Sequence, residues 1–342
     1  MHQAAAMPRT RRIETLPTKE SRARARKSIG KLRHQVLSKK TEERYAAAFT
    51  ASRQFHKLAC NFAIHNFEKF DDVVAEYIEF LWESGEPKSY ANYTLAGIQF
   101  YRPQVKQHLP WSWKLAKIWN QVEMPVRATP LTPQVMLAFA GAALRWRQPQ
   151  FAWLLVVAFA LFLRTGELLQ LAPRDVTLDG TSAIIFVQGS KGSKRTFLPL
   201  ERLQLDEPVA LQALKNLLYA HKAAKTTPFW GESRRSFMDT WHSVADHLAL
   251  PLDLYKPYSL RRGGATSAYK NGVPLDVLVT KGRWQHVHTA RIYLDTGLQA
   301  LAAVNLPPLS RPRIQAATEF YRTVSQSGAR GRRDMSSRAG FP

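Results

Sequence analysis

The chain has 342 residues, of which 49 are lysine or arginine and 26 are aspartate or glutamate, so its formal net charge is +23. A charge so far from zero suits a protein that meets a polyanion, and nucleic acid is the commonest polyanion. Cys60 is the only cysteine, which excludes an intrachain disulfide framework, a cysteine zinc cluster and a redox CxxC pair. The length is typical of about two domains.

The two ends of the chain hold most of the positive charge. Residues 1–40 carry a net charge of +10 and residues 311–342 a net charge of +5, which leaves +8 for the residues between them. Both ends are poor in apolar residues, so we predict two basic, disordered tails. They are either plain solvated extensions, a nonspecific grip on DNA or a nuclear-import signal, and the sequence does not separate these roles.

No segment predicts secretion or a membrane span. The first twelve residues are basic but lack the apolar stretch of a secretory signal. The longest apolar run, residues 151–163, has thirteen residues, whereas a membrane helix needs about 20. We therefore expect a protein that is neither secreted nor in a membrane, located in the nucleus in a eukaryote and otherwise in the cytoplasm.

Residues 41–122 show helical spacing of apolar residues and predict a small domain of about four helices. An aspartate pair at Asp71 is the predicted start of the second helix, and Gly85 its end. Pro103 ends the third helix, and a short fourth follows. Residues 123–133 contain three prolines and predict a linker.

A second domain is predicted over residues 134–310, mainly helical with a small antiparallel β-sheet, so the fold class is α+β. Thr132, followed by a proline, has N-cap chemistry for its first helix. A buried helix over residues 150–170 comes next. Two short strands, residues 182–188 and 195–200, then flank a turn. Further helices are predicted over residues 207–222, 234–249, 259–271, 274–280 and 286–294.

Arg164 ends the apolar run, and Glu167 lies three residues further, on the same face of the predicted helix. A guanidinium attached to such an apolar segment is costly unless an anion meets it. Either the two residues form a structural ion pair, or Arg164 is held for a phosphate and Glu167 orients it. An arginine suits a phosphate because its planar fork bonds two oxygens at once.

A second motif, SLRRGGAT, begins at Ser259, which is the predicted N-cap of a helix. Arg261 and Arg262 then fall in the first turn, where cations oppose the helix dipole. Residues that break a local rule in this way are often functional, and helix N-termini also bind anions. The motif therefore predicts an anion site.

A third motif, GRW, is followed by Tyr293, which lies nine residues after Trp284. A lone tyrosine on a helix is more often structural than nucleophilic. His286 and His288 have no companion ligands at metal-binding spacing, so we interpret them as solvated residues. We expect no metal and no cofactor.

Together the ordered motifs resemble the catalytic domain of the tyrosine recombinase (phage integrase) family. The resemblance covers residues 130–300, and residues 41–122 are similar to the family's helical core-binding domain, which clamps DNA. The wording of the motifs is most similar to eukaryotic mobile-element recombinases of the DIRS and Crypton kind. The resemblance implies the catalytic positions Arg164, Lys191, Tyr258, Arg261, Trp284 and Tyr293, with Glu167 in support.

The resemblance also implies a mechanism without metal. Tyr293 would attack a DNA phosphate and form a 3′-phosphotyrosine, while Arg164 and Arg261 stabilise the charge that gathers on the phosphate oxygens. Lys191, in the turn between the two strands, would protonate the leaving 5′-oxygen. Lys194 is the alternative if the turn has a different register.

Tyr258 departs from the family pattern, which usually has histidine at this position. A histidine titrates near neutral pH, whereas tyrosine has a reference pKa of about 10. Tyr258 would thus donate a hydrogen bond to a phosphate oxygen but accept a proton poorly at pH 7. Two other interpretations stay open: a catalytically weak or inactive DNA-binding protein on the same fold, and a nicking-and-closing topoisomerase.

The implied partners are double-stranded DNA, held between the two domains, and further copies of the same chain, as a dimer or tetramer on DNA. The short apolar helix over residues 297–305 packs on a neighbouring copy in the family. In this chain it packs either on such a copy or on its own domain.

Overall fold

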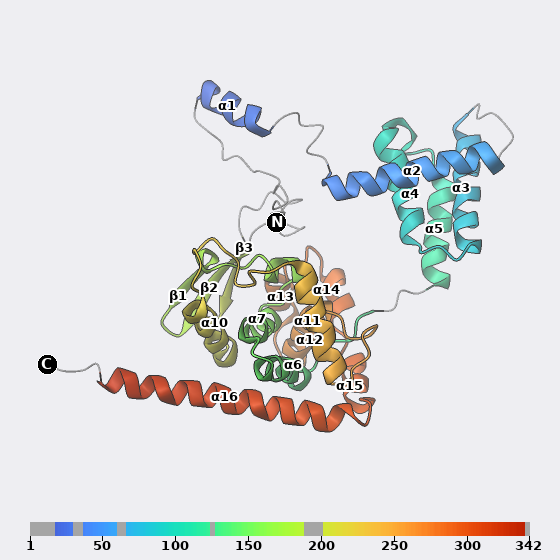
Figure 1. Ribbon diagram of the computed structural model, residues 1–342. Coiled ribbons are helices and arrows are strands. Elements are labelled where there is room, and N and C mark those ends of the chain that lie inside the picture. The colour runs from blue at the N-terminus through green and yellow to red at the C-terminus, as the bar shows by residue number, and fades with distance from the viewer. Residues whose placement is uncertain (1–17, 30–36, 60–65, 124–126, 188–200, 339–342) are drawn as a thin grey trace, which may run out of the picture. The chain divides into compact units, whose positions relative to one another are not determined.

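A computed structural model describes residues 18–29, 37–59, 66–123, 127–187 and 201–338. The chain divides into two compact units, residues 1–125 and residues 126–342. The described residues are mainly helical with one small antiparallel sheet (Figure 1). This confirms the predicted α+β fold class. No helix in the described ranges is long and apolar enough to cross a membrane.

The first unit is a helical bundle with its own apolar core. The described α-helices of this unit are α1 (Lys19–Ile29), α2 (Lys39–Ala59), α3 (Phe67–Glu83), α4 (Ser89–Tyr101) and α5 (Pro110–Val122), and α2 to α5 pack together as the bundle. The core gathers side chains from α3, α4 and α5, among them Val74, Ile78, Leu81, Leu95, Ile98 and Trp119. Helix α1 lies within the segment predicted to be a disordered tail, so that prediction was wrong for Lys19–Ile29.

Asp71 does not open a helix, contrary to the prediction. Helix α3 begins four residues earlier, with Asn66 as its N-cap. Asp71 is buried, and its carboxylate accepts hydrogen bonds from the backbone N–H groups of Trp111 and Ser112 at 2.8 and 3.0 Å. It therefore satisfies the free donors at the start of α5, a role that only the packed bundle reveals.

The second unit has a large hydrophobic core built on two central helices, α6 (Pro133–Arg145) and α7 (Pro149–Ala160), and a smaller apolar cluster around Phe162 and Trp284. Thr132 caps α6 as predicted, since its Oγ1 accepts a hydrogen bond from Val135 N at 3.2 Å. The helices of this unit are α6 (Pro133–Arg145), α7 (Pro149–Ala160), α8 (Thr165–Leu168), α10 (Pro208–Ala220), α11 (Arg234–His247), α12 (Tyr258–Lys270), α13 (Leu275–Gly282), α14 (Val287–Tyr293), α15 (Thr296–Val304) and α16 (Ser310–Arg338).

The sheet has the order β1-β2-β3 and is antiparallel throughout. Its strands are β1 (Val176–Asp179), β2 (Ser182–Val187) and β3 (Glu201–Leu205). Strand β2 was predicted, β1 was not, and the strand predicted over residues 195–200 lies outside the described residues. Val187 pairs with Glu201, so the two ends of the segment between β2 and β3 lie side by side.

The buried helix predicted over residues 150–170 is broken. Helix α7 ends at Ala160, and Phe162 takes a left-handed φ of 49°. Arg164 is the N-cap of the separate short helix α8 rather than part of the apolar helix. The break turns the chain, and it brings Phe162 O within hydrogen-bond distance of two arginines, Arg261 of α12 and Arg283.

Helix α12 begins at Tyr258 with Pro257 as its N-cap, so the prediction of Ser259 as N-cap was wrong. The helix is buried along most of its length because its two glycines allow close packing. A Cβ on Gly263 would collide with the backbone of Leu131, and a Cβ on Gly264 with the carbonyl of Phe159. The SLRRGGAT motif is thus also a packing motif.

The chain after residue 310 is not wholly a disordered tail, which corrects a second prediction. Helix α16 lies along α6, with Ile314, Ala317 and Tyr321 buried (Figure 1). Gly141 permits this contact, because a Cβ there would collide with the carbonyl of Ala317. The three buried residues recur at helical spacing, a signal that the arginine-rich composition of the whole segment concealed.

Candidate active site

Tyr293 is the last residue of α14, and two neighbouring elements hold it. Thr266 Oγ1, on α12, donates a hydrogen bond to Tyr293 O at 3.0 Å. The Tyr293 ring lies against Trp284, with ring centroids 4.9 Å apart, and against Tyr258, with centroids 5.7 Å apart. The backbone and the ring of Tyr293 are therefore both fixed next to the start of α12.

Arg261 lies directly beside this tyrosine and is fully buried. Its guanidinium carbon is 4.9 Å from the Trp284 ring centroid and 5.5 Å from the Tyr293 ring centroid. Nη1 donates to Phe162 O at 2.5 Å, and Nη2 donates to Gly282 O. Burial, together with the charges of Arg164 and Arg283, lowers the pKa of Arg261 to about 10, so it stays charged at neutral pH.

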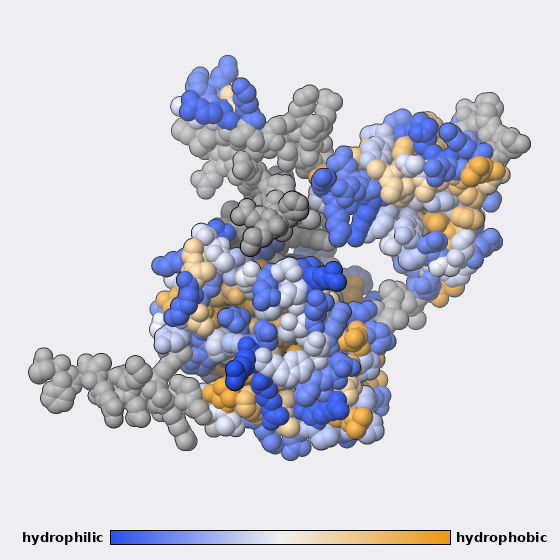
Figure 2. Space-filling model, in the orientation of Figure 1, coloured by the Kyte–Doolittle hydropathy of each residue, from blue (hydrophilic) through white to orange (hydrophobic). Residues whose placement is uncertain are grey.

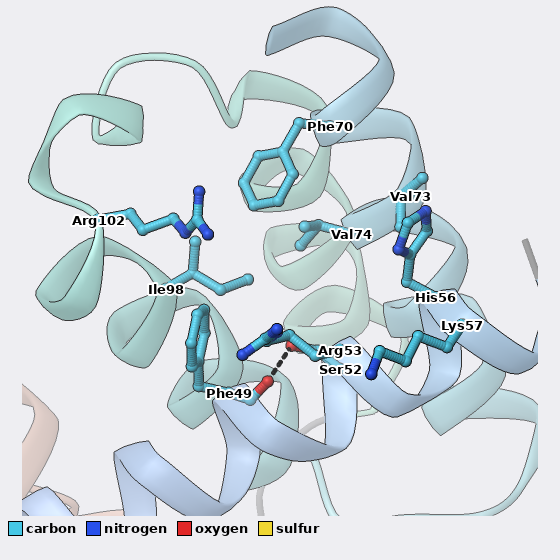
Figure 3. Close-up of a pocket in the computed structure, with 10 residues that line it drawn as sticks. All are labelled: Phe49, Ser52, Arg53, His56, Lys57, Phe70, Val73, Val74, Ile98 and Arg102. Atoms are coloured by element: carbon cyan, nitrogen blue, oxygen red, sulfur yellow. Dashed lines mark hydrogen bonds between the residues drawn. The ribbon is translucent and has the colours of Figure 1, made fainter. Parts of the chain in front are cut away.

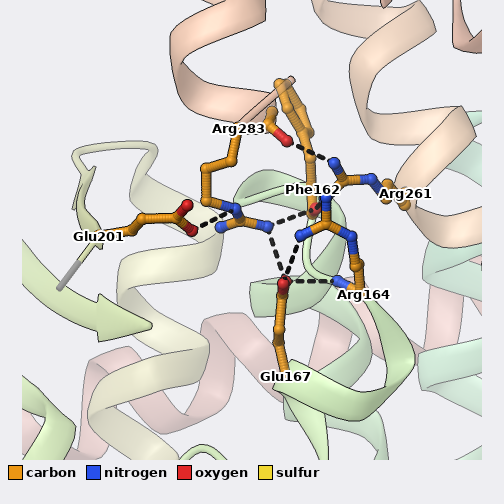
Figure 4. Close-up of polar contacts among 7 residues, drawn as sticks. Phe162, Arg164, Glu167, Glu201, Arg261 and Arg283 are labelled. Atoms are coloured by element: carbon orange, nitrogen blue, oxygen red, sulfur yellow. Dashed lines mark hydrogen bonds and ion pairs between the residues drawn. The ribbon is translucent and has the colours of Figure 1, made fainter. Parts of the chain in front are cut away.

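Arg164 and Glu167 are joined through the cap of α8. The Glu167 carboxylate accepts from Arg164 Nη1 at 2.7 Å and from Arg164 N at 2.8 Å (Figure 4). The predicted pair therefore exists, although it is made by a helix N-terminus and not by one continuous helix face. The Arg164 side chain is 27% exposed, so it reaches solvent while Glu167 holds it.

Arg283 joins the same cluster and was missed by the sequence analysis. Its side chain is 3% exposed, with Nη2 2.7 Å from Glu167 Oε2 and Nε 3.3 Å from Glu201 Oε2. Nη2 also donates to Phe162 O at 3.1 Å. Its position beside Trp284 in the GRW motif was the available signal, but no nearby sequence pattern predicts its contact with Glu167, 116 residues away.

Tyr258 stands at the entrance of the cluster and is 38% exposed. Burial first, then a hydrogen bond with the Tyr293 side chain, raise the pKa of Tyr258 well above its ordinary value. A hydrogen bond raises the pKa of a phenol when the phenol donates it. The raised pKa keeps Tyr258 protonated at neutral pH, so its hydroxyl is available to donate a hydrogen bond.

Several buried donors in the cluster lack a partner. In the described part of the chain, no group accepts a hydrogen bond from Arg261 Nε, Arg283 Nη1 or Trp284 Nε1. Buried donors are nearly always satisfied, and three arginines here face only two carboxylates, those of Glu167 and Glu201. The cluster has the charge and the free donors of an anion site.

Lys191 and Lys194 lie outside the described residues, so the structure does not place either lysine. The ends of their segment are placed. Glu201, the first residue of β3, contacts Arg283, and Val187 is its partner on β2. Val187 and Glu201, the described residues before and after the lysines, are therefore neighbours, and Glu201 contacts the arginine cluster.

A second basic feature lies in the first unit, at a cavity of about 280 Å³ between α2, α3 and α4 (Figure 3). Its lining is apolar inside and basic at the rim, where Arg53, His56, Lys57 and Arg102 gather, and no acidic residue lines it. Hydrophilic side chains cover much of the described surface in Figure 2. The described residues hold no group of three or more His, Cys, Asp or Glu that suits a metal ion.

The sequence model of the phage integrase family matches residues 139–298. These residues belong to the phage integrase family. The match includes the residues that the structure brings together, namely Arg164, Glu167, Tyr258, Arg261, Arg283, Trp284 and Tyr293. A search of curated proteins found no match to the chain.

Solved structures of a recombinase and of integrases share the fold of this chain. A XerH site-specific recombinase in a post-cleavage complex with a palindromic difH substrate has a TM-score of 0.57 at 14% identity, over 78% of each chain. The Tn1549 transposon integrase, in complex with transposon right end DNA, has a TM-score of 0.59 at 14% identity, over 80% of this chain and 95% of that one. A lambda integrase dimer bound to a COC′ core site has a TM-score of 0.56 at 14% identity, over 77% and 90%.

Proposed function

We propose that this integrase-family protein is a DNA breaking-rejoining enzyme, a site-specific tyrosine recombinase or integrase that acts in DNA recombination or mobile-element integration. The observation that carries the proposal is the contact between Tyr293 and Arg261. The ring of a potential nucleophile has its centroid 5.5 Å from the carbon of a buried guanidinium that has no carboxylate partner among the described residues. The similar XerH and Tn1549 structures are DNA complexes, which supports DNA as the substrate.

Tyr293 is the proposed nucleophile. Its phenolic oxygen attacks the scissile phosphorus, the bond from phosphorus to the 5′-oxygen breaks, and a 3′-phosphotyrosine and a free 5′-hydroxyl result. The covalent link conserves the phosphodiester for the rejoining step. Tyr258 assists by donating to the Tyr293 oxygen, which stabilises the negative charge that develops there as the proton leaves to solvent.

The arginines stabilise the transition state. Negative charge gathers on the non-bridging oxygens of the phosphate, and Arg164 and Arg261 meet it from fixed positions. The unpartnered Trp284 Nε1 supplies one more donor toward the same anion. These groups are already oriented by Glu167, Phe162 O and Gly282 O, so little reorganisation is needed when the phosphate arrives.

The leaving 5′-oxygen needs a proton, and Lys191 is the proposed general acid, with Lys194 as the alternative. The support is the position of Val187 and Glu201, the neighbouring residues before and after the lysines, of which Glu201 contacts Arg283. A mutation of each lysine to alanine, tested on DNA with a 5′-bridging sulfur, separates the two. The sulfur leaves without a proton, so only the true general acid is rescued.

We propose that both units contact double-stranded DNA and that the protein acts as a dimer or tetramer. The basic rim of the first unit supplies phosphate contacts, which position a protein on DNA without reading its sequence. The similar lambda integrase is a dimer on its core site. Helix α15 contacts α12 of its own chain, where Gln299 Nε2 donates to Ser267 Oγ at 3.0 Å.

The deciding experiment traps the covalent intermediate. Nicked suicide substrates made from the DNA that flanks the gene are incubated with the protein, and adducts are resolved under denaturing conditions. The wild type should give a protein–DNA adduct on the tryptic peptide that contains Tyr293. Tyr293→Phe should bind the same DNA and give none, and an adduct that persists in this variant would reject Tyr293 as nucleophile.

A second candidate function is DNA binding with little or no catalysis, and Tyr258 is the observation that favours it. A wild type that binds flanking DNA but yields no adduct would support this function. Relaxation of supercoiled DNA without exchange between paired sites would instead indicate a nicking-and-closing activity.

A further inference from the structure

Arg283 has contacts that no other residue of the described cluster combines. Two edges of its guanidinium meet different carboxylates, Glu167 through Nη2 at 2.7 Å and Glu201 through Nε at 3.3 Å. Figure 4 shows it between these two side chains, with Arg164 and Arg261 on the side of Glu167 and Phe162. It thus connects the start of β3 to the cap of α8.

Arg283 also touches the acceptors that hold Arg261. Phe162 O accepts from Arg261 Nη1 at 2.5 Å and from Arg283 Nη2 at 3.1 Å. Gly282 O accepts from Arg261 Nη2, and Gly282 directly precedes Arg283. Arg283 has a left-handed φ of 56°, a conformation that is uncommon for a residue other than glycine and clusters at functional sites.

We propose that Arg283 is a positioning residue, which orients Arg164 by fixing the Glu167 carboxylate. This inference rests on the proposed function, because it concerns the geometry of the DNA-cleaving step. Glu167 has two oxygens: Oε1 accepts from Arg164 Nη1, and Oε2 accepts from Arg164 N and Arg283 Nη2. Arg283 therefore holds the carboxylate oxygen that the Arg164 side chain leaves free.

A lysine cannot replace Arg283 in this role. Arg283 bonds one carboxylate through Nη2 and faces another through Nε, on two edges of a rigid plane, whereas a lysine has a single nitrogen. Arg283→Lys keeps the buried charge but releases one of the two carboxylates. The position demands the planar fork, and not only the positive charge.

The test combines Arg283→Lys and Glu167→Gln in a double-variant cycle, read as the rate of single-turnover cleavage of a nicked suicide substrate. We expect each single variant to cleave about 10- to 100-fold more slowly than the wild type, the range in which supporting partners of a site usually act. The double variant should be no slower than the worse single variant, because Arg283 acts through Glu167. Rate losses that multiply would overturn the proposal.

Two further readouts exclude a merely structural role. The Kd for DNA should stay unchanged in Arg283→Lys, because this side chain is 3% exposed; a weakened Kd would overturn the assignment. DNA with a 5′-bridging sulfur should not rescue Arg283→Lys. Rescue would mean that Arg283→Lys slows the departure of the leaving group, through Glu201, and would overturn the assignment of Arg283 to Arg164 and Glu167.

The matched control is Arg174→Lys, on an arginine of the same unit that contacts Asp175 and no residue of the cluster. Its cleavage rate should equal that of the wild type. Urea unfolding of the same variants gives a readout that needs no activity: the losses of stability in Arg283→Lys and Glu167→Gln should not add, and additive losses would overturn the coupling. A wild type that yields no adduct refutes the proposed function, and the unfolding cycle then decides the Arg283–Glu167 coupling by itself.

Discussion

Helix α12 carries two adjacent buried arginines that differ in their partners: Arg262 has a carboxylate beside it, and Arg261 has carbonyl groups. Arg262 is 2% exposed, and its Nη2 lies 3.6 Å from the Asp295 carboxylate. It also donates to Ala128 O and Ile292 O, so it ties the start of the second unit to the end of α14. Arg261 is equally buried, yet its acceptors are only carbonyl groups, Phe162 O and Gly282 O.

The difference shows which buried charge is available to a ligand. Burial lowers the pKa of both arginines. Asp295 raises that of Arg262 again, against a smaller lowering by Arg127. Arg164 and Arg283 lower the pKa of Arg261 further, and Glu167 offsets this only in part, so that it falls to about 10. A buried charge without a counter-ion is unfavourable in the protein alone. An anion that arrives beside Arg261 supplies the missing counter-ion, so the unfavourable burial becomes binding energy for a phosphate.

The largest effect is expected for Arg261→Met. Cleavage of a suicide substrate should fall about 10²-fold or more, because a preorganised charge donor is removed from the transition state. The free energy of unfolding should change little. Phe162 O keeps Arg283 as a donor, so only Gly282 O loses its side-chain donor, and the removal of a buried charge without a carboxylate partner offsets that loss. Single-turnover cleavage and urea unfolding measure the two quantities. If Arg261→Met cleaves at the wild-type rate, Arg261 does not serve the phosphate, and the proposed difference from Arg262 is wrong.

Arg262→Met should show the reverse pattern. Its loss leaves two carbonyl groups without their donor and Asp295 without its ion-pair partner, which should destabilise the fold by about 1–3 kcal/mol. The adduct yield of the folded protein should stay within tenfold of the wild type. An abolished adduct in a folded Arg262→Met variant would show that this arginine, too, serves the phosphate.

Tyr258 tests how the Arg261 side of α12 works without the histidine of the family pattern. Tyr258→Phe should slow cleavage by less than tenfold, because one ordinary hydrogen bond contributes about 0.5–1.5 kcal/mol. The raised pKa keeps Tyr258 protonated across pH 6–9, so it adds no titration to the wild-type rate in this range. In Tyr258→His the cleavage rate should show an additional titration at about pH 6.5. A complete loss in Tyr258→Phe would mean that its hydroxyl is central to the chemistry.

The smallest effects belong to exposed cations, which contrast with both buried arginines. Arg53→Gln or Arg102→Gln, at the rim of the cavity in the first unit, should weaken DNA binding about equally for all sequences. Each should reduce the slope of log K against log salt by about 1 if it contacts one phosphate. Titrations at several salt concentrations measure the slope, and unchanged slopes would remove this rim from the DNA-binding surface.

The sequence by itself was enough for the helical character of both units, the antiparallel strand β2, the cap at Thr132 and the family. It was also enough to single out Arg164, Glu167, Arg261, Trp284 and Tyr293, because these positions have fixed residue types and fixed spacing. Such signals are local, since periodicity, caps and motifs depend on residues within a few turns. The roles of these residues and of Lys191 remain for the experiments above.

Only the tertiary structure decided which buried arginine is neutralised and which is not. Arg261 meets Phe162, 99 residues away, and Arg283 meets Glu167, 116 residues away, so neither contact has a local signature. The same holds for Asp71 at α5 and for α16 on α6, where a residue's partner depends on how distant segments pack. Sequence patterns specify the helices and strands, whereas the charge of a buried side chain is compensated only by the elements that pack against it. In this protein Arg262 meets a carboxylate, that of Asp295, whereas the acceptors of Arg261 are carbonyl groups.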